Sequence, residues 1–486
     1  MLMTVLAGFY LLCVMLVSLY ATGTGVLLLT YLRFRHKDII TPQIDTWPGV
    51  AIQLPVYNER YVIERLLEAV AALDYPRDRL IIQVLDDSTD DTSDVIAHKV
   101  AALGIGGLRI DHVRRSARTG YKAGALAHGL ALLSADPEIE YVAVFDADFI
   151  PSPDFLRRTI PHLVADAGLG MVQGRWGHLN SDDNPLTMGQ TLALDGHFIV
   201  EQTARNRAGW LMNFNGTAGV WRIKAIEDAG GWLDVTLTED LDLSYRAQLK
   251  GWRFLYLPDI VVPAELPPQM NAYKQQQARW AKGGTQCATM LLKPVWAHPR
   301  LSLAQRLMAT MHLCQYLVHP LLVCMLLLTP PLLIAQQIQR LPLGFVGLVG
   351  IAPPMVFAIS QADQYRDWPR RLLALPILIA FGTGIAWSNT RAVISGLLGR
   401  KGEFKRTPKF AHRVEAKRYA TGLSRSTFFE LALAAYALWG AFMAARLAPG
   451  LVPYLLLYSI AFAAVSIASV RDDFNNLRAL HQRKAL

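Results

Sequence analysis

The feature that most constrains the fold is an uncharged apolar run at the start of the chain. Residues 1–32 contain no charged side chain, and Arg33, Arg35 and Lys37 follow at once. The run is longer than the ~20 residues that a helix needs to span the hydrocarbon core of a membrane. It has no basic segment before it and no small-residue cleavage site after it. We therefore predict a retained transmembrane helix and not a cleaved signal peptide.

Further apolar stretches occupy the last third of the chain. They lie at residues 307–335, 343–360, 372–387, 428–447 and 451–470. With 52% hydrophobic and only 18% charged residues, the composition also indicates a multi-pass membrane protein. The stretch at 343–360 is short and contains Pro353 and Pro354, so it is the weakest candidate for a span.

A basic segment separates the third stretch from the fourth. Residues 400–425 hold nine Lys or Arg residues against Glu403 and Glu415, which predicts a cytoplasmic loop. If the globular part is also cytoplasmic, an even number of spans must separate the two, yet three stretches stand between them. We expect the one around Pro353 to be re-entrant or interfacial. The predicted location is the inner membrane of a bacterium.

Residues 37–293 have the composition of a globular α/β domain. Apolar runs at 50–54, 80–85 and 141–145 each end in polar residues, and helical patterns follow the first two. Strands that alternate with helices predict a mainly parallel sheet, with a ligand crevice at the strand C-termini. The predicted organisation is a transmembrane helix (1–36), a cytoplasmic α/β domain (37–293) and a region of transmembrane and interfacial helices (294–486).

Two aspartates close the third apolar run. Asp146 and Asp148 follow residues 142–145, so the pleat of the strand directs both carboxylates to one side of its end. Mg²⁺ or Mn²⁺ that is bound mainly through phosphate oxygens needs few protein carboxylates, and this pair suits such a cation. The alternative is a turn that merely uses aspartate. The neighbouring motifs favour the metal site.

Polar residues also close the second run. Asp86 and Asp87 stand where a carboxylate can accept hydrogen bonds from a base or ribose. The same segment could instead cap the helix that begins near Thr92. Further along, Arg118 and Lys122 lie one turn apart where a loop enters a small-residue helix. Such a cationic pair suits a diphosphate, although alone it would more often be a solvated face.

Acidic residues reappear at the start of an amphipathic helix. Glu239 and Asp240 lie in its first turn, where the helix dipole favours acids whatever their function. Inverting sugar transfer needs a carboxylate that removes a proton from the acceptor hydroxyl, and we assign this catalytic role to Asp240, with Glu239 beside it. Arg279 next to Trp280 suits a phosphate and a stacked sugar ring. Together these residues predict glycosyl transfer from a nucleotide sugar.

The distribution of charge argues against a nucleic-acid partner. The formal net charge is +9, and the basic residues gather next to apolar segments. Contacts with the membrane surface and with phosphate explain this pattern, and no zinc-finger, RRM or basic-helix motif competes. Membrane lipids and a nucleotide sugar are therefore the expected partners.

The motifs together resemble those of one enzyme family. In order they are QVLDDSTDDT (83–92), GYKAGAL (120–126), VFDADF (144–149), FNGTAGVWR (214–222), TEDLDL (238–243) and QQARW (276–280). The chain resembles a family 2 inverting glycosyltransferase of the cellulose-synthase superfamily. Within it, the chain resembles the cellulose-synthase-like A and C types that make β-mannan or β-glucan backbones. The resemblance covers about residues 50–280. It implies an α/β catalytic domain of GT-A type, with a mainly parallel sheet, combined with an α-helical transmembrane region.

The resemblance also implies a role for each matching residue. Asp87 would bind the nucleoside, Asp146 and Asp148 the divalent cation and diphosphate, and Asp240 would be the base. The other positions would meet the pyrophosphate (Gln276, Arg279), stack under the acceptor sugar (Trp280) or border the acceptor entrance (Asn215, Gly216, Thr217). Residues 401–409 (KGEFKRTPK) stand where such synthases carry a cytoplasmic gating segment, in a form that differs from the cellulose-synthase one.

Three functional hypotheses follow. The first is a processive synthase that elongates a β-linked polysaccharide from UDP-glucose or GDP-mannose and passes the growing glycan through its own helices, with export partners unknown. The second is a single-transfer enzyme that glycosylates a lipid acceptor such as a ceramide or diacylglycerol. The third is a noncatalytic membrane scaffold, which the intact aspartates and Arg279 argue against. The motif residues do not distinguish the two donors.

Overall fold

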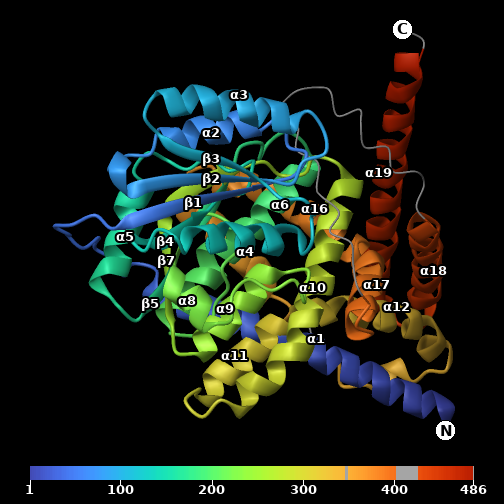
Figure 1. Cartoon of the computed structure of the whole chain (residues 1–486). Helices are drawn as coiled ribbons and strands as arrows, with labels where there is room; N and C mark the ends of the chain where they lie inside the picture. Colours follow the sequence, from blue (N-terminus) through green and yellow to red (C-terminus); the bar gives the residue numbers. More distant parts are fainter. Residues whose placement is uncertain (345–348, 401–424, 485–486) are drawn as a thin grey trace.

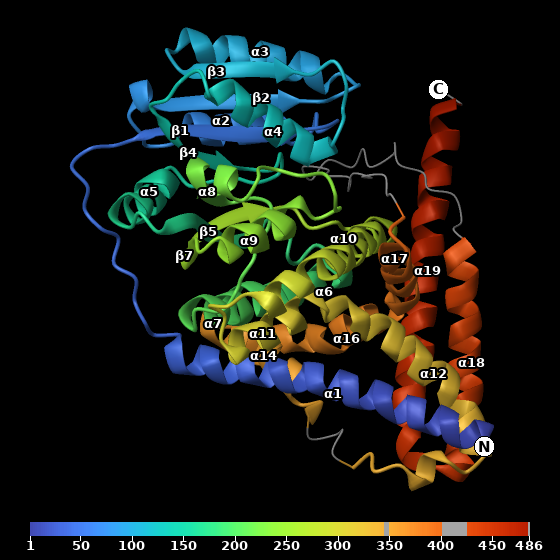
Figure 2. The ribbon, with the colours of Figure 1, turned by 60° about the horizontal axis from the view of Figure 1, so that its bottom comes forward.

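The computed structural model describes residues 1–344, 349–400 and 425–484, with side chains described to residue 475. An α/β part is built around one sheet, and long apolar helices lie beside and beneath it (Figures 1 and 2). The basic segment and the gating segment expected at 401–409 lie outside the described residues, apart from Arg400 and Arg425 at the ends of the former.

The α/β part holds a seven-stranded sheet in the order β3-β2-β1-β4-β6-β5-β7. Its strands are β1 (Gly49–Val56), β2 (Leu80–Asp86), β3 (Arg109–Arg114), β4 (Ile139–Val144), β5 (Leu169–His178), β6 (Gly219–Arg222) and β7 (Arg253–Ala264). Neighbouring strands are parallel except at β6, which runs antiparallel to both β4 and β5. The mainly parallel sheet is confirmed, and its strands β1, β2 and β4 are the three predicted runs.

Helices cover both faces of the sheet. One hydrophobic core joins Val50, Ile52 and Leu54 of β1 to α2 (Ile63–Ala71), α3 (Thr92–Ile105) and α5 (Phe155–Ala165). A second core joins Ala51 of β1 to α4 (Tyr121–Leu133), α8 (Ile223–Asp228) and α9 (Glu239–Leu249). Alternate side chains of a strand point to opposite faces, so a strand covered on both sides is apolar throughout.

The remaining elements of the α/β part are a short helix before β2 and the helices that follow β5 and β7. They are η1 (Arg77–Arg79), α6 (Pro185–Asp195), the π-helical segment η2 (Gly196–Gln202), α7 (Thr203–Arg207), α10 (Met270–Ala297) and α11 (Leu303–Leu313). Strand β7 is followed by α10, a helix of 28 residues that carries the QQARW motif. This helix connects the edge of the sheet with the apolar helices.

Four helices in the described part of the chain are long and apolar enough to cross a membrane. They are Leu2–Phe34, Gln315–Ile334, Ser426–Leu447 and Pro449–Asn475. A fifth span arises if Trp368–Gly384 and Ala386–Leu397, which are bent by 44° at their junction, count as one. The elements concerned are α1 (Leu2–Phe34), η3 (Gln315–Leu317), α12 (Val318–Ile334), η4 (Ile338–Arg340), α14 (Ala352–Gln364), α15 (Trp368–Arg371), η5 (Leu372–Ala374), α16 (Leu375–Gly384), α17 (Ala386–Leu397), α18 (Arg425–Leu447), η6 (Pro449–Leu451) and α19 (Val452–Lys484).

The helix at Pro353 is not a complete span. It is α14, whose 13 residues are fewer than the ~20 that a crossing requires. It packs beside α1, where Asp363 accepts hydrogen bonds from Tyr31 Oη at 2.7 Å and Arg35 Nη1 at 2.8 Å. Among the described residues, the candidate spans between the α/β part and the basic segment are Gln315–Ile334 and the bent pair, if that pair counts as one span. The number would then be even, and the re-entrant or interfacial placement of the segment around Pro353 stays a prediction.

Gly283 allows α10 to lie close to the start of α9, so a larger residue at this position should disturb the contact. A Cβ at Gly283 would lie 2.6 Å from Thr238 Cγ2 and 2.9 Å from the Thr238 backbone nitrogen. We expect Gly283→Ala to push the two helices apart and destabilise the protein by about 1–3 kcal/mol, as overpacking does. A lower melting temperature of the detergent-solubilised protein would report this.

Gly382→Ala is the matched control. Gly382 also lies in a helix, α16, and a Cβ there would meet nothing within 4 Å. Because alanine favours a helix over glycine by about 1 kcal/mol, this variant should melt at the same temperature or higher. If Gly283→Ala melted like Gly382→Ala, the close approach of α10 and α9 would be wrong.

Candidate active site

A cavity of about 180 Å³ lies at the C-terminal ends of β1, β2 and β4. Polar residues that follow neighbouring parallel strands meet at this edge of the sheet. The cavity is lined by nearly all the predicted site residues: Asp87, Arg118, Lys122, Asp146, Asp148, Asn215, Gly216, Glu239, Asp240, Gln276, Arg279 and Trp280. Segments almost two hundred residues apart in sequence therefore form one site.

Lys122 lies at the centre of the acidic residues. Its Nζ donates to Asp146 Oδ1 at 2.5 Å and to the Gly216 carbonyl at 2.8 Å, and lies 4.0 Å from Glu239 Oε1. Burial lowers the pKa of Lys122, but the nearby carboxylates of Asp146 and Glu239 outweigh it and raise the pKa above its usual value. The ammonium group is therefore a fixed positive charge among the acids.

The pKa of Asp240 is unusually high for an aspartate. Burial and the adjacent charge of Glu239 raise its pKa to about 7, against the opposing effects of Lys122 and Arg279. Its Oδ1 accepts a hydrogen bond from the Leu241 backbone N–H at 2.9 Å. A carboxylate with a pKa near neutrality can take up a proton at neutral pH and release it afterwards, as a general base must.

The loop before β6 approaches Asp240 closely at a glycine. Gly216 has φ of +83°, and a Cβ at this residue would lie 2.9 Å from Asp240 Oδ2. Any larger residue would be strained there and would also crowd the carboxylate. Glycine therefore allows this backbone, whose carbonyl holds Lys122, to border the cavity.

Asp146 and Asp148 provide oxygen ligands of the kind that a hard divalent cation prefers. The side chain of Asp146 is 36% exposed, whereas that of Asp148 is buried and its Oδ2 accepts the Glu265 backbone N–H at 3.2 Å. Among the described residues, no group of three or more His, Cys, Asp and Glu side chains could hold a metal. The pair thus fits Mg²⁺ or Mn²⁺ only if a bound diphosphate supplies further ligands.

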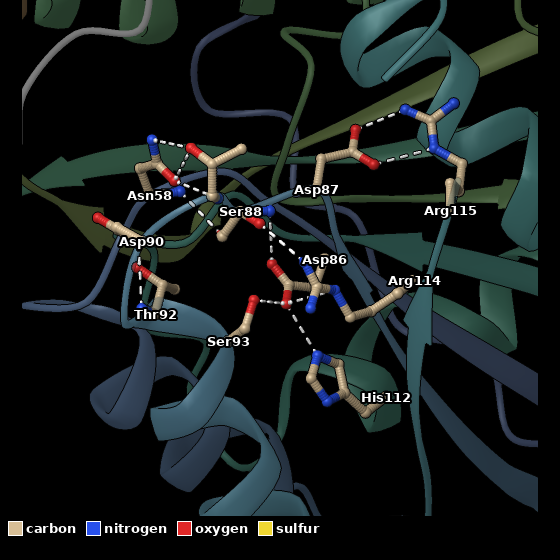
Figure 3. A network of polar contacts seen from close by, with 11 residues as sticks. Asn58, Asp86, Asp87, Ser88, Asp90, Thr92, Ser93, His112, Arg114 and Arg115 are labelled. Atoms are coloured by element: carbon tan, nitrogen blue, oxygen red, sulfur yellow. Dashed lines mark hydrogen bonds and ion pairs between the residues drawn. The ribbon is translucent and has the colours of Figure 1, made fainter. Parts of the chain in front are cut away.

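Asp87 is held by an arginine that the sequence analysis missed. Arg115 forms a two-pronged ion pair with it, with Nε 3.0 Å from Asp87 Oδ1, and both side chains are nearly buried (Figure 3). Arg115 follows β3, and only the sheet order places β3 beside β2. On the same side, the guanidinium of Arg118 stacks 3.4 Å from the centre of the Tyr57 ring.

Two predicted site residues do not line this cavity. Asp86 turns away from Asp87 and accepts hydrogen bonds from Ser93 Oγ at 2.6 Å and His112 Nε2 at 2.9 Å (Figure 3). Burial raises the pKa of Asp86, but these hydrogen bonds outweigh it and lower the pKa. Thr217 is fully buried, and its Oγ1 accepts the Asp146 backbone N–H at 2.9 Å. In this structure both side chains support their neighbours, and a role of either in ligand binding stays a prediction.

A second cavity of about 370 Å³ adjoins the first. The two share Asn215, Asp240, Gln276 and Trp280. The second is also lined by Tyr20 of α1, by Phe357 of α14 and by residues of the η2 segment. Asp240 and Trp280 thus stand at the junction of a cavity in the α/β part and one that reaches the apolar helices.

The second cavity contains a hydrogen-bonded pair, His197 and Glu201, that the sequence analysis also missed. His197 Nδ1 lies 3.2 Å from Glu201 Oε2, and His197 Nε2 lies 3.4 Å from Asn215 Oδ1. Burial raises the pKa of Glu201, but His197 outweighs it and lowers the pKa, so Glu201 is ionised at neutral pH. The spacing of four residues was the available signal, but the helix that it required was not predicted.

Comparisons with known proteins identify relatives of the chain. Residues 48–283 match the family model described as "Glycosyltransferase like family 2". The chain is 36% identical to glucomannan 4-beta-mannosyltransferase 1 of Oryza sativa subsp. japonica, over 80% of this chain and 75% of that one. It is 37% identical to glucomannan 4-beta-mannosyltransferase 2 of Arabidopsis thaliana, over 78% and 71% of the two chains.

One solved structure shares the fold. It is the mannosyltransferase PcManGT from Pyrobaculum calidifontis in complex with GDP-Man and Mn²⁺, with a TM-score of 0.53 and 20% sequence identity. The match covers 80% of this chain and 99% of that one. At this identity the likeness concerns the fold alone.

Proposed function

The chain belongs to glycosyltransferase family 2, and on that premise we propose that it elongates a β-linked mannan or glucomannan chain from GDP-mannose. As a member of this family it is a hexosyltransferase with a GT-A catalytic fold. The glucomannan 4-beta-mannosyltransferases that match most of its length support the product and the donor sugar. The observation that carries the proposal is the position and acidity of Asp240. Its carboxyl group has a pKa of about 7 and lies at the junction of the two cavities.

The first cavity would hold the nucleotide sugar. Asp87, fixed by Arg115, would bind the nucleoside at the edge beside β2. Further into the cavity, the diphosphate would meet the side chains of Arg118, Gln276 and Arg279, as guanidinium and amide groups donate to phosphate oxygens. Asp146 and Asp148 would hold Mg²⁺ or Mn²⁺, which supplies positive charge to the diphosphate when bound.

The reaction would join an acceptor hydroxyl to the donor sugar with inversion. The hydroxyl oxygen attacks the anomeric carbon from the face opposite the diphosphate, and the bond between that carbon and the diphosphate oxygen breaks. Asp240 receives the hydroxyl proton, and the nucleoside diphosphate leaves with the bonding electron pair. The Lys122 ammonium, 2.5 Å from Asp146, offsets part of the negative charge in the site.

The second cavity would hold the end of the acceptor. Its position between the α/β part and Tyr20 of α1 would direct a growing glycan toward the apolar helices. Trp280, which lines both cavities, would support the acceptor ring by stacking. Glu201 and His197 supply polar groups that can accept from and donate to sugar hydroxyls. We also propose that the growing polymer passes through the helices of the protein.

We also propose that the α/β domain (37–293) lies at the cytoplasmic face of the membrane. Arg33, Arg35 and Lys37 at the end of α1 support this orientation. The four or five apolar helices fit a membrane protein. The bacterial inner membrane stays a prediction, because the curated relatives named above come from plants.

Membranes that contain the protein should be incubated with labelled GDP-mannose or labelled UDP-glucose. We expect label from GDP-mannose in an insoluble polymer that a β-mannanase degrades. Transfer from UDP-glucose alone would overturn the donor assignment. Chloroform-soluble label would instead identify a lipid glycosyltransferase, which shares the same aspartates and QQARW motif.

Removal of the divalent cation provides a second prediction. Transfer should stop in excess EDTA and return with Mn²⁺ or Mg²⁺. Asp146 and Asp148 are negatively charged, so they need a bound cation to hold the diphosphate. Asp148→Asn should need a higher cation concentration for half-maximal rate, while its expression in the membrane should match that of the unmodified protein. Full activity in EDTA would refute the metal assignment.

The pKa of Asp240 predicts how the rate depends on pH. The base must be deprotonated, so kcat/KM should fall about tenfold per pH unit below a pKa near 7 and level off above it. Asp240→Asn cannot take a proton and should lose on the order of 10²-fold in turnover with donor binding retained. Collapse of donor affinity in this variant would show that Asp240 is structural instead.

Replacement of Trp280 separates an acceptor role from an interfacial one. Trp280→Ala should shorten or abolish the polymer while donor binding persists, since a stacked sugar contact contributes roughly 0.5–1.5 kcal/mol. Trp280→Phe should keep partial function. Product lengths on a gel and nucleotide affinity are the measurements. Normal-length product together with poor membrane assembly would favour an ordinary interfacial aromatic residue.

A further inference from the structure

Helix α10 carries two sets of residues on opposite faces. At 3.6 residues per turn, Gln276, Arg279 and Trp280 share one face, and these residues line the proposed active site. Asn271 and Lys274 fall on the other face. That second face contacts α19, one of the last two long helices of the chain. The catalytic face of α10 is thus supported from behind by the C-terminal helices.

Lys274 joins three helices at one buried point. Its Nζ donates to Glu430 Oε2 of α18 at 2.7 Å and to Ser469 Oγ of α19 at 3.5 Å. The side chains of Lys274 and Glu430 are 9% and 0% exposed. Ser426 Oγ of α18 donates to the other carboxylate oxygen of Glu430 at 3.2 Å. The carboxylate is therefore fixed on both oxygens.

Asn271 makes a second attachment one turn earlier on α10. Its backbone N–H donates to Asp472 Oδ2 at 3.2 Å, and its Nδ2 donates to Asp473 Oδ1 at 2.9 Å and to the Ser469 carbonyl at 3.2 Å. Two attachment points on one face fix both the rotation of α10 about its axis and its position along that axis. The orientation of Gln276, Arg279 and Trp280 depends on both.

A buried ion pair such as Lys274–Glu430 contributes little net stability to a fold. Desolvation of two buried charges offsets most of their attraction, and well-packed apolar residues often serve as well. Glu430 also lies near the start of an apolar helix that is long enough to cross a membrane, where an ionisable residue is costly and usually functional. A buried ion pair can instead fix the register in which helices dock, and this pair links α10 to α18.

We propose that Lys274 and Glu430 are positioning residues that set the catalytic face of α10. They touch neither cavity and would act through Gln276, Arg279 and Trp280. The inference rests on the proposed function, because it is the transfer reaction that needs this face in place. A displacement of about 1 Å at reacting groups can cost on the order of 10²-fold in rate, so a small shift of α10 suffices.

The test is a double-mutant cycle on the full-length protein. Lys274→Met and Glu430→Gln each remove one charge while they keep similar size. We expect each to lower kcat on the order of tenfold or more, with a smaller loss of affinity for GDP, because Asp87 and Arg118 at the nucleotide end of the cavity do not lie on α10. The double variant should be no slower than either single variant. If kcat per GDP-binding enzyme stays within threefold in both single variants, the positioning role is overturned.

Arg446→Gln is the matched control. It removes a charge from the exposed far end of the same helix, α18, and should leave kcat unchanged. Hydrogen exchange gives a readout that does not depend on the donor sugar. Exchange in residues 270–281 should become faster in Lys274→Met and stay the same in Arg446→Gln. Absence of any transfer by the unmodified protein would refute the proposed function, and unchanged exchange in Lys274→Met would refute the positioning role.

Discussion

The site depends on the attraction between the Lys122 ammonium and the acids around it. Asp146 comes from the end of β4, Glu239 and Asp240 come from α9, and the Gly216 carbonyl comes from the loop before β6. Without this cation, three buried or half-buried carboxylates would repel one another, and each would be protonated more readily. The same charge lowers the pKa of Asp240, against the effects of burial and of Glu239. One lysine on a small-residue helix therefore makes the acidic cluster possible.

The sequence predicted the strands and motifs well because their determinants are local. The runs that became β1, β2 and β4 are continuous and apolar, and the polar residues after them can only lie at one edge of a parallel sheet. Asp87, Asp146 and Asp240 therefore lie together as expected. The antiparallel strand β6 has only four residues, too few for its periodicity to stand out.

The positions and partners that the sequence did not reveal have a common physical cause. Adjacent side chains such as Asp86 and Asp87 point to opposite sides of the backbone, and a sequence motif does not show which one enters the cavity. Arg115 is paired with Asp87 through the lateral order of β3 and β2, and Lys274 with Glu430 across 156 residues of sequence. Such contacts depend on how distant elements pack, which local patterns do not encode. The burial of Thr217 behind Asp146 belongs to the same class.

The walls of the second cavity come from parts of the chain that are synthesised at different times. Its walls include Tyr20, near the start of the chain, and Phe357, which is more than three hundred residues later. A ribosome therefore makes one wall first and adds the opposite wall only after the α/β part and the apolar helix at Gln315–Ile334 have been synthesised. A nascent chain that ends before α14 already contains every residue that lines the first cavity but still lacks one wall of the second.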